Sequence, residues 1–293
     1  MFTHRRLLAS TCAAAAFALS AVATANTVAL SPLLPPSTAS SSGASATFLQ
    51  ISNSWSDSTV LWNGSQYGTG TPIGDTSWGT GLWGIADFNA VRSGQVPTIA
   101  AWNGMVSTIN FGDGCYDAVH SATWGAANLA PLFSPGVGCA STDVNSDASN
   151  AQDNWLSYFT GYIRITDPDA YNFSVLYDDG FFFNLYGADG TQSISKDFLN
   201  PRDRLGFGYG LGLLPGLYRY ELGAYDRLQA GVVDLRWCRS TDCDNKIWTL
   251  VPPESLVNVP EPGSLGLMGC GLAGLFLWRR RVAAAALRTP HAA

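Results

Sequence analysis

The sequence predicts an all-β protein built as an antiparallel β-sandwich. Short runs of aromatic and β-branched residues recur through the middle of the chain, and Gly, Asp, Asn and Pro bound them. No long apolar pattern with the helical period of 3.6 residues accompanies these runs. The segment between two Pro-rich stretches has about 200 residues, enough for one domain of this class.

The clearest strands lie in the second half of the chain. Three are predicted in succession: YIRIT (162–166), YNFSVLY (171–177) and FFFNLYG (181–187). The polar segments DPDA, DDG and ADG, which follow them in turn, have the composition of turns. YRYELGAY (218–225) and GVVDLRW (231–237) predict a final hairpin. Residues 77–89 and 98–112 are weaker strand candidates, because glycine disfavours strand interiors.

The N-terminus has the features of a secretory signal peptide. Arg5 and Arg6 precede an apolar run over 7–22, and the small residues 23–25 form an A-x-A cleavage signature. We therefore expect a signal peptide over 1–25 and a mature start near Asn26. The alternative is a buried or membrane-spanning helix, which the short run disfavours.

The exported part has a simple predicted layout. Residues 26–47 are rich in Ser, Ala and Pro and predict a linker, and 251–259 predict a stiffer Pro-rich stalk. The β-sandwich is then expected over 48–250. All 22 acidic residues lie in 26–262, against ten of the 16 basic residues, so this region has a net charge of −12. Such a charge argues against nucleic acid as a partner.

The C-terminus combines three features. Pro260, Glu261 and Pro262 precede an uncharged apolar segment over 263–278, and three arginines follow it. A helix of 16 residues spans about 24 Å, less than the bilayer core of about 30 Å, so a short transmembrane helix is expected. Arg279, Arg280 and Arg281 place residues 282–293 in the cytoplasm as a tail.

This arrangement resembles the PEP-CTERM sorting signal of Gram-negative bacteria, here over 260–281. The resemblance implies that an exosortase, a membrane enzyme, processes the chain. It also implies export through the inner membrane, transient anchoring, and release to the cell surface or extracellular matrix, in an exopolysaccharide and biofilm context. An ordinary single-pass anchor is the alternative. The tail after the arginines is longer than is usual for the family.

A second resemblance covers residues 155–240. An F-x-G-x-I strand, a Y-x-F-x-V strand, DDG and a strand ending in G-x-D-G are similar to the protective-antigen lectin-like domain, as is the closing PGLYRYELGAYDRLQAGVVDLRW. The resemblance implies a β-sandwich, and it implies carbohydrate binding for some members.

In the adhesins of that family, two adjacent aspartates coordinate Ca²⁺, and Asp178 and Asp179 occupy the matching positions. Adjacent carboxylates suit Ca²⁺, which takes six to eight oxygen ligands. Asp-Asp-Gly is also an ordinary turn sequence, in which Asp accepts backbone N–H groups and Gly adopts positive φ. Both interpretations stay open at the sequence level.

Four cysteines fall in the exported region, which predicts two disulfides. Spacing favours Cys115 with Cys139 and Cys238 with Cys243, among three possible pairings. A zinc site is the rival, but His120 is the only histidine of the exported region and no C-x-x-C pair occurs.

Other sites have weak signals. Residues 143–154 begin like a Ca²⁺ loop, but Ala148 replaces the glycine and Asn154 the glutamate that such a loop requires. No G-x-S-x-G, P-loop or dinucleotide motif occurs, so we expect no enzyme activity. The leading prediction is a surface or matrix protein that binds polysaccharide. A structural protein without a ligand and a glycan hydrolase are the alternatives.

Overall fold

A computed structural model describes residues 28–52, 55, 61–62, 71–72, 81–112, 130–131, 154–227, 231–245 and 247–259. The predicted signal peptide, the sorting segment over 260–281, the tail, Cys115 and Cys139 lie outside these ranges. No helix in the described ranges is long and apolar enough to cross a membrane.

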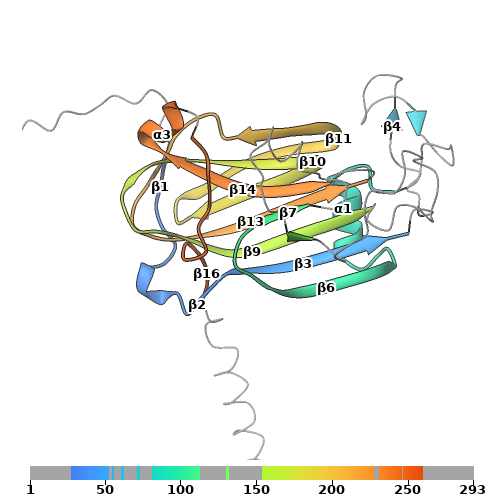
Figure 1. Cartoon of the computed structure of the whole chain (residues 1–293), viewed down its shortest axis with the longest axis horizontal. Helices are drawn as coiled ribbons and strands as arrows, with labels where there is room; N and C mark the ends of the chain where they lie inside the picture. Colours follow the sequence, from blue (N-terminus) through green and yellow to red (C-terminus); the bar gives the residue numbers. More distant parts are fainter. Residues whose placement is uncertain are drawn as a thin grey trace, which may run out of the picture.

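The elements are almost all strands (Figure 1). In the first half they are β1 (Val28–Leu30), η1 (Pro36–Thr38), β2 (Ser41–Ser42), β3 (Ala44–Ile51), β4 (Leu61–Trp62), β5 (Thr71–Pro72), α1 (Ile85–Arg92), β6 (Thr98–Val106), β7 (Asn110–Gly112) and β8 (Ala130–Pro131). The second half has β9 (Trp155–Ile165), β10 (Asp169–Gly187), β11 (Gly190–Gly206), β12 (Leu211–Leu213), β13 (Gly216–Asp226), β14 (Val232–Arg239), α3 (Ser240–Asp244), β15 (Thr249–Leu250) and β16 (Leu256–Asn258).

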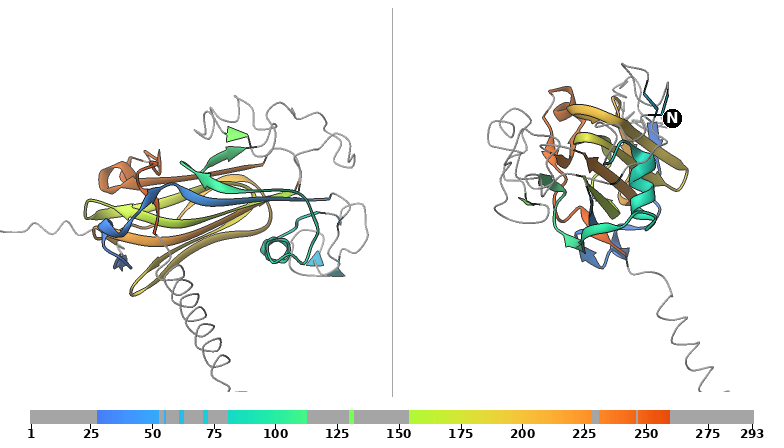
Figure 2. Two further views of the ribbon diagram at one scale, coloured as in Figure 1. Left: turned by 90° about the horizontal axis from the view of Figure 1, so that it is seen from below. Right: turned by 90° about the vertical axis from the view of Figure 1, so that its right-hand side faces the viewer.

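One mixed sheet of 14 strands folds into two facing layers, which confirms the predicted β-sandwich. The β9 layer contains β6, β3, β9, β13 and the second half of β10, in that order. The β14 layer contains β7, β14 and the first half of β10. Most pairs are antiparallel, but β1 with β12 and β7 with β8 are parallel. Figures 1 and 2 show α1 and α3 at opposite ends of the strands.

Strand β10 joins the two layers. Its residues 171–178 pair with β14, and its residues 180–186 pair with β13. The ring of Phe173 in the first half packs on that of Phe183 in the second half, so β10 folds back on itself at 178–180, here called the β10 bend. Strand β11 follows it, with irregular register opposite Asp179. DDG therefore turns the chain as expected, but it connects two layers rather than neighbouring strands.

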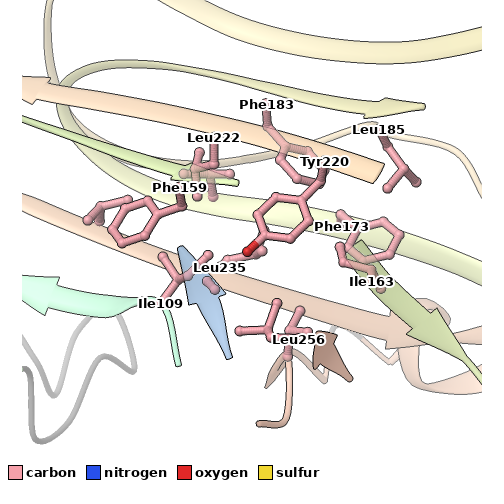
Figure 3. Packing of buried hydrophobic residues seen from close by; sticks show 14 of the residues in the cluster. Ile109, Phe159, Ile163, Phe173, Phe183, Leu185, Tyr220, Leu222, Leu235 and Leu256 are labelled. Atoms are coloured by element: carbon pink, nitrogen blue, oxygen red, sulfur yellow. The ribbon is translucent and has the colours of Figure 1, made fainter. Parts of the chain in front are cut away.

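The core lies between the layers and is mostly aromatic. The two halves of β10 face each other there, with ring centroids of Phe173 and Phe183 5.8 Å apart and those of Tyr177 and Phe181 4.7 Å apart. Alternation along β13 sends Tyr218, Tyr220 and Leu222 into the same core. Figure 3 shows Tyr220 surrounded by apolar side chains from both layers.

A second apolar cluster lies where α1 covers the outer face of the β9 layer. Phe88 and Val91 of α1 are buried with Leu156 and Tyr225, and Phe88 meets the ring of Phe182 edge-on at 5.2 Å. We expected strand structure within 77–89, but residues from 85 onward are helical. Their spacing places Ile85, Phe88 and Val91 on the side that covers the sheet.

The predicted hairpin of 218–225 and 231–237 is wrong in its pairing, although both strands exist. Strand β13 pairs with β9 and β10, whereas β14 pairs with β10, β7 and β15. The short connection after Asp226 carries the chain from one layer to the other, because both strands have a core face that the opposite layer covers. Residues 98–112 contain β6 and β7, as expected.

The predicted linker and stalk are also part of the sandwich. Residues 28–47 contain β1, β2 and the start of β3, and Leu30, Ala44 and Ala46 are buried. The small side chains of Ala44 and Ala46 suit their positions because they belong to the same cluster as bulky aromatic residues. In the predicted stalk, Val251 and Leu256 are buried and β16 pairs with β9. The folded body therefore extends beyond 48–250, to 28–259.

Cys238 and Cys243 form a disulfide, as the sequence predicted, with Cα atoms 5.0 Å apart. It closes the turn between β14 and α3. Cys238 is buried, so the bridge ties α3 to the body of the sandwich.

Candidate functional site

Asp178 and Asp179 lie in the β10 bend, at the end of the sandwich where α1 packs. Asp178 stands opposite Val232 at the start of β14, and Gly180 stands opposite Tyr225 near the end of β13. The two aspartates thus occupy the position where β13 and β14 separate. Both are half-buried, and the peptide bond between them is cis. The structure places them at a bend inside β10 and leaves them half-buried, whereas an ordinary turn would leave them exposed.

The carboxylate of Asp178 is held by an arginine of the neighbouring strand. Its Oδ2 lies 2.9 Å from Nη2 of Arg202, and the two side chains are 16% and 12% exposed. Arg202 belongs to residues 197–202, where β11 bends alongside β10. This ion pair offsets the negative charge of one of the two adjacent aspartates.

The carboxylate of Asp179 binds the connection between β13 and β14. Its Oδ2 accepts a hydrogen bond from the backbone N–H of Arg227 at 2.9 Å. Asp179 therefore fixes the start of that connection, which Asp226 leads into from the buried end of β13. The sequence left open the interpretation that this carboxylate binds a backbone amide. That interpretation holds for Oδ2 of Asp179, although the amide it binds is distant in the chain.

Position 180 requires glycine because neighbouring strands approach it closely, and not because its backbone has a positive φ. It is not among the residues with positive φ, contrary to the expectation for a DDG turn. A Cβ atom there would overlap the hydroxyl and ring of Tyr225 and would lie 2.8 Å from the backbone oxygen of Lys196. The glycine is needed because β10, β11 and β13 converge at the bend.

Further carboxylates lie around Tyr225 at the same end. Asp197 accepts hydrogen bonds from the backbone N–H groups of Ile85 at 2.7 Å and Phe198 at 2.8 Å, so it caps α1 from β11. Asp87 accepts the N–H of Trp83 at 2.7 Å. Burial raises the pKa of Tyr225 well above its ordinary value, and the nearby charges of Asp197, Asp179 and Asp87 add to the effect.

The sequence did not identify Asp87, Asp197, Arg202 and Arg227 as neighbours of the DDG motif. They come from four different segments, and no spacing or motif links them. Asn154, which we considered as the end of a Ca²⁺ loop, instead accepts the backbone N–H of Leu82 at 2.9 Å and is buried. Asp143, Asn145 and Asp147 of that loop lie outside the described residues.

As a metal site, the bend supplies part of what Ca²⁺ requires. Two adjacent carboxylates are suitable anionic ligands, but Ca²⁺ takes six to eight oxygens. Over the described ranges, no group of three or more His, Cys, Asp or Glu residues is placed to hold a metal. Asn200 stands opposite Asp179, and its Nδ2 donates to the backbone oxygens of Asp197 at 2.8 Å and Phe198 at 3.1 Å. Its side-chain oxygen is therefore a further candidate ligand.

Known proteins resemble the chain in two ways. Residues 258–281 match the family model described as the PEP-CTERM protein-sorting motif. No curated protein matches the chain. Some solved structures are also similar to the chain, at low sequence identity.

Three of these structures illustrate the range. A PA14 sugar-binding domain from an RTX adhesin is 11% identical, with 75% of this chain and 99% of that chain covered and a TM-score of 0.41. The epithelial adhesin 6 A domain from Candida glabrata, in complex with Galb1-3GlcNAc, is 16% identical over 78% and 93%, with a TM-score of 0.43. An anti-sigma factor domain-containing protein is 13% identical, with a TM-score of 0.41, and this chain spans 49% of its length.

The sorting motif follows directly from the folded body. Strand β16, which pairs with β9 and β2, ends at Asn258, where the match begins. The chain thus carries a PEP-CTERM protein-sorting motif at residues 258–281, attached to a β-sandwich.

Proposed function

We propose that this protein is exported, processed by an exosortase-type enzyme, and displayed at the surface or in the matrix of a Gram-negative bacterium. There its sandwich binds polysaccharide. The sorting motif at 258–281 supports the first part. The observation that carries the second part is the pair of adjacent carboxylates at the β10 bend, held by Arg202 of β11 and by the backbone N–H of Arg227.

In this proposal Asp178 and Asp179 hold a Ca²⁺ ion, with Asn200 as a further oxygen ligand. A Ca²⁺ ion would supply a Lewis-acidic centre with coordination positions open to sugar hydroxyls. The chain's own residues position the carboxylates: Arg227 binds Asp179 through its backbone N–H, and Arg202 binds Asp178. Ionised carboxylates on adjacent residues repel each other, so a cation bound by both would lower the energy of the pair.

Arg202 also favours a second candidate function, a structural surface protein without a ligand. Its guanidinium already offsets the charge of Asp178, so the pair needs no metal for charge balance. The two functions differ in what removal of Arg202 does. If Arg202 competes with Ca²⁺ for Asp178, removing the guanidinium raises Ca²⁺ affinity. If the ion pair is purely structural, removing it gives no Ca²⁺ binding.

The test is Ca²⁺ titration by calorimetry on the purified exported protein. We expect uptake at millimolar Ca²⁺ or below, its loss in Asp178→Asn and Asp179→Asn, and tighter binding in Arg202→Met. Asp203→Asn is the matched control, because Asp203 is an exposed neighbour on β11 and should retain uptake. Polysaccharide retention should be lost with a chelator. Absence of Ca²⁺ uptake in both the wild type and Arg202→Met would contradict the Ca²⁺ site and support the structural function.

The sorting half is tested by mass spectrometry of the cell-surface form. Cells with an active exosortase should release a chain cut near Pro260, Glu261 and Pro262. Substitution of these three residues should leave an uncut, membrane-held form, and Ala at Arg279–Arg281 should weaken retention during export. A mature surface form that keeps Trp278 would contradict this half.

A further inference from the structure

We infer that a cavity at the α3 end of the sandwich is a second, metal-independent site, for a sugar residue that carries a carboxylate. The cavity has a volume of about 350 Å³, within the range of small-ligand sites. Its lining includes Arg164, Tyr171, Trp237, Arg239 and Thr249. Tyr171 is seven residues before Asp178 on β10, so about 23 Å of strand separates this cavity from the β10 bend.

Trp237 provides an aromatic wall. It is half-buried on β14, and its ring packs against Tyr171 and Phe173 with centroid distances of 5.3 and 6.0 Å. These contacts hold the indole in place, so little side-chain freedom is lost when a ligand binds. The indole is the part of the lining best suited to the apolar C–H face of a sugar ring.

Arg164 gives the site its charge preference. Its Nε is buried and, in the part of the chain that the structure describes, has no hydrogen-bond partner. Buried donors in native proteins almost always have a partner, so a lone one needs an explanation. A guanidinium binds a carboxylate with two parallel hydrogen bonds, which identifies the carboxylate as the fitting partner.

The other arginine of the cavity, Arg239, differs because its guanidinium already has protein partners. Arg239 Nη1 lies 3.3 Å from Asp167 Oδ2. A hydrogen bond to Tyr171, the largest cause, raises the pKa of Arg239. Arg164 is therefore the arginine of this cavity whose guanidinium has no side-chain partner among the described residues, and because its Nε is buried, a ligand would contact its terminal Nη nitrogens.

The rest of the lining suits hydroxyl groups. Asp242 and Glu254 are exposed at the cavity and can accept hydrogen bonds from sugar hydroxyls, and Thr166, Thr249 and Ser255 add hydroxyls. Asp242 and Glu254, together with the Asp167 that pairs with Arg239, outnumber the two arginines, so no long-range field attracts anions. Selection for a carboxylate then depends on direct contact with Arg164. A carboxylate without a sugar ring would lack the contact with the indole of Trp237.

The test uses the purified exported protein in chelator, with methyl glucuronoside as the probe. Methyl glucoside tests the need for the carboxylate, and succinate tests the need for the sugar. Binding is measured by calorimetry and by the NMR signal of the Trp237 indole N–H. We expect the glucuronoside to bind at millimolar concentration and the other two probes at least tenfold more weakly.

Two variants locate the site, and two more serve as controls. Arg164→Gln should weaken glucuronoside binding by about tenfold to a hundredfold, because a charge-assisted hydrogen bond is lost. Arg219→Gln, a paired arginine on β13, is the matched control and should bind normally. Asp178→Asn should also bind normally, which separates this site from the proposed Ca²⁺ site. Trp237→Phe serves as the second variant, and it should weaken binding even if Arg164→Gln fails to fold.

The inference is overturned by any of three results: no glucuronoside binding to the wild type, equal binding of methyl glucoside or succinate, or unchanged binding in a folded Arg164→Gln variant. Loss of binding in Asp178→Asn would also overturn it, since the ligand would then belong to the β10 bend.

Discussion

The side chains of Asp178 and Arg202 are joined by an ion pair of 2.9 Å that links the bends of β10 and β11. Both are largely buried, so little water screens them. Removing one partner leaves the other charge poorly solvated. We expect Arg202→Met to lower the free energy of unfolding by about 1–3 kcal/mol in the absence of Ca²⁺.

Urea unfolding measures this effect, and a second ion pair serves as its control. Arg219 and Glu221 lie 2.6 Å apart but are 41% and 23% exposed. Arg219→Met should therefore change stability by less than about 1 kcal/mol. Equal effects of the two substitutions would show that burial does not strengthen the Asp178–Arg202 pair.

Tyr220→Phe should stabilise the protein. The Tyr220 hydroxyl is buried in the core and has no hydrogen-bond partner in the described structure, and burial alone raises the pKa of Tyr220. Removing an unsatisfied polar group should raise the free energy of unfolding by about 1 kcal/mol.

Tyr218 on the same strand provides the opposite case. Its hydroxyl donates to the backbone oxygen of Leu30 at 2.9 Å and accepts the N–H of Leu214 at 3.0 Å. Tyr218→Phe should therefore destabilise by about 1 kcal/mol. Thermal unfolding of both variants distinguishes them, and a loss of stability in Tyr220→Phe would indicate an unrecognised partner for that hydroxyl.

Gly180→Ala should destabilise strongly. Its methyl group would overlap Tyr225 and approach the backbone of Lys196, so the three converging strands would have to separate. We expect a loss of about 3 kcal/mol or more. Gly208→Ala is the control: Gly208 has open space and a φ of +74°, so only the strain of about 1 kcal/mol applies. Similar losses in the two variants would argue against close packing at the bend.

Stability should fall in alkaline solution. Burial raises the pKa of Tyr177 to about 12, and the charges of Asp203 and Asp178 contribute. In the unfolded chain this pKa is about 10. The stability from neutral Tyr177 is therefore fully present below pH 10 and is lost as the pH rises to about 12.

Tyr177→Phe should reduce this alkaline loss and leave the stability at pH 8 nearly unchanged. Burial also raises the pKa of Tyr218 to about 12. Tyr218 should therefore still contribute to the loss of stability in alkaline solution. Urea unfolding between pH 8 and 12 measures both effects. An unchanged pH profile in Tyr177→Phe would mean that Tyr177 titrates alike in the folded and unfolded states.

The disulfide of Cys238 and Cys243 should contribute about 2 kcal/mol, because it closes a short loop. Ser at both positions should lower stability by this amount, and non-reducing peptide mapping of exported protein should find the pair linked. Free thiols at both positions would contradict the prediction.

Local sequence was sufficient to determine several features. Alternation identified the strands of β9, β10, β13 and β14, because one face of each must be apolar to cover the core. The same pattern, with DDG between two strands, located the β10 bend. The short spacing of Cys238 and Cys243 identified their pairing, since five residues of separation suit a tight loop.

Tertiary structure decided which strands are neighbours. Strands β13 and β14 have the pattern of a hairpin, yet they lie in different layers, because a short connection can equally join two layers that share a core. It also determined that residues 28–47 and 251–259 belong to the sandwich. Their composition resembles that of a linker, and only the folded structure brings the neighbours that cover Leu30 and Leu256. Arg202 and Asp197 reach the β10 bend only because β11 bends with β10. Arg164 shares a cavity with Trp237 only because residues 249–255 connect the layers, and a linear pattern does not contain contacts between such distant segments.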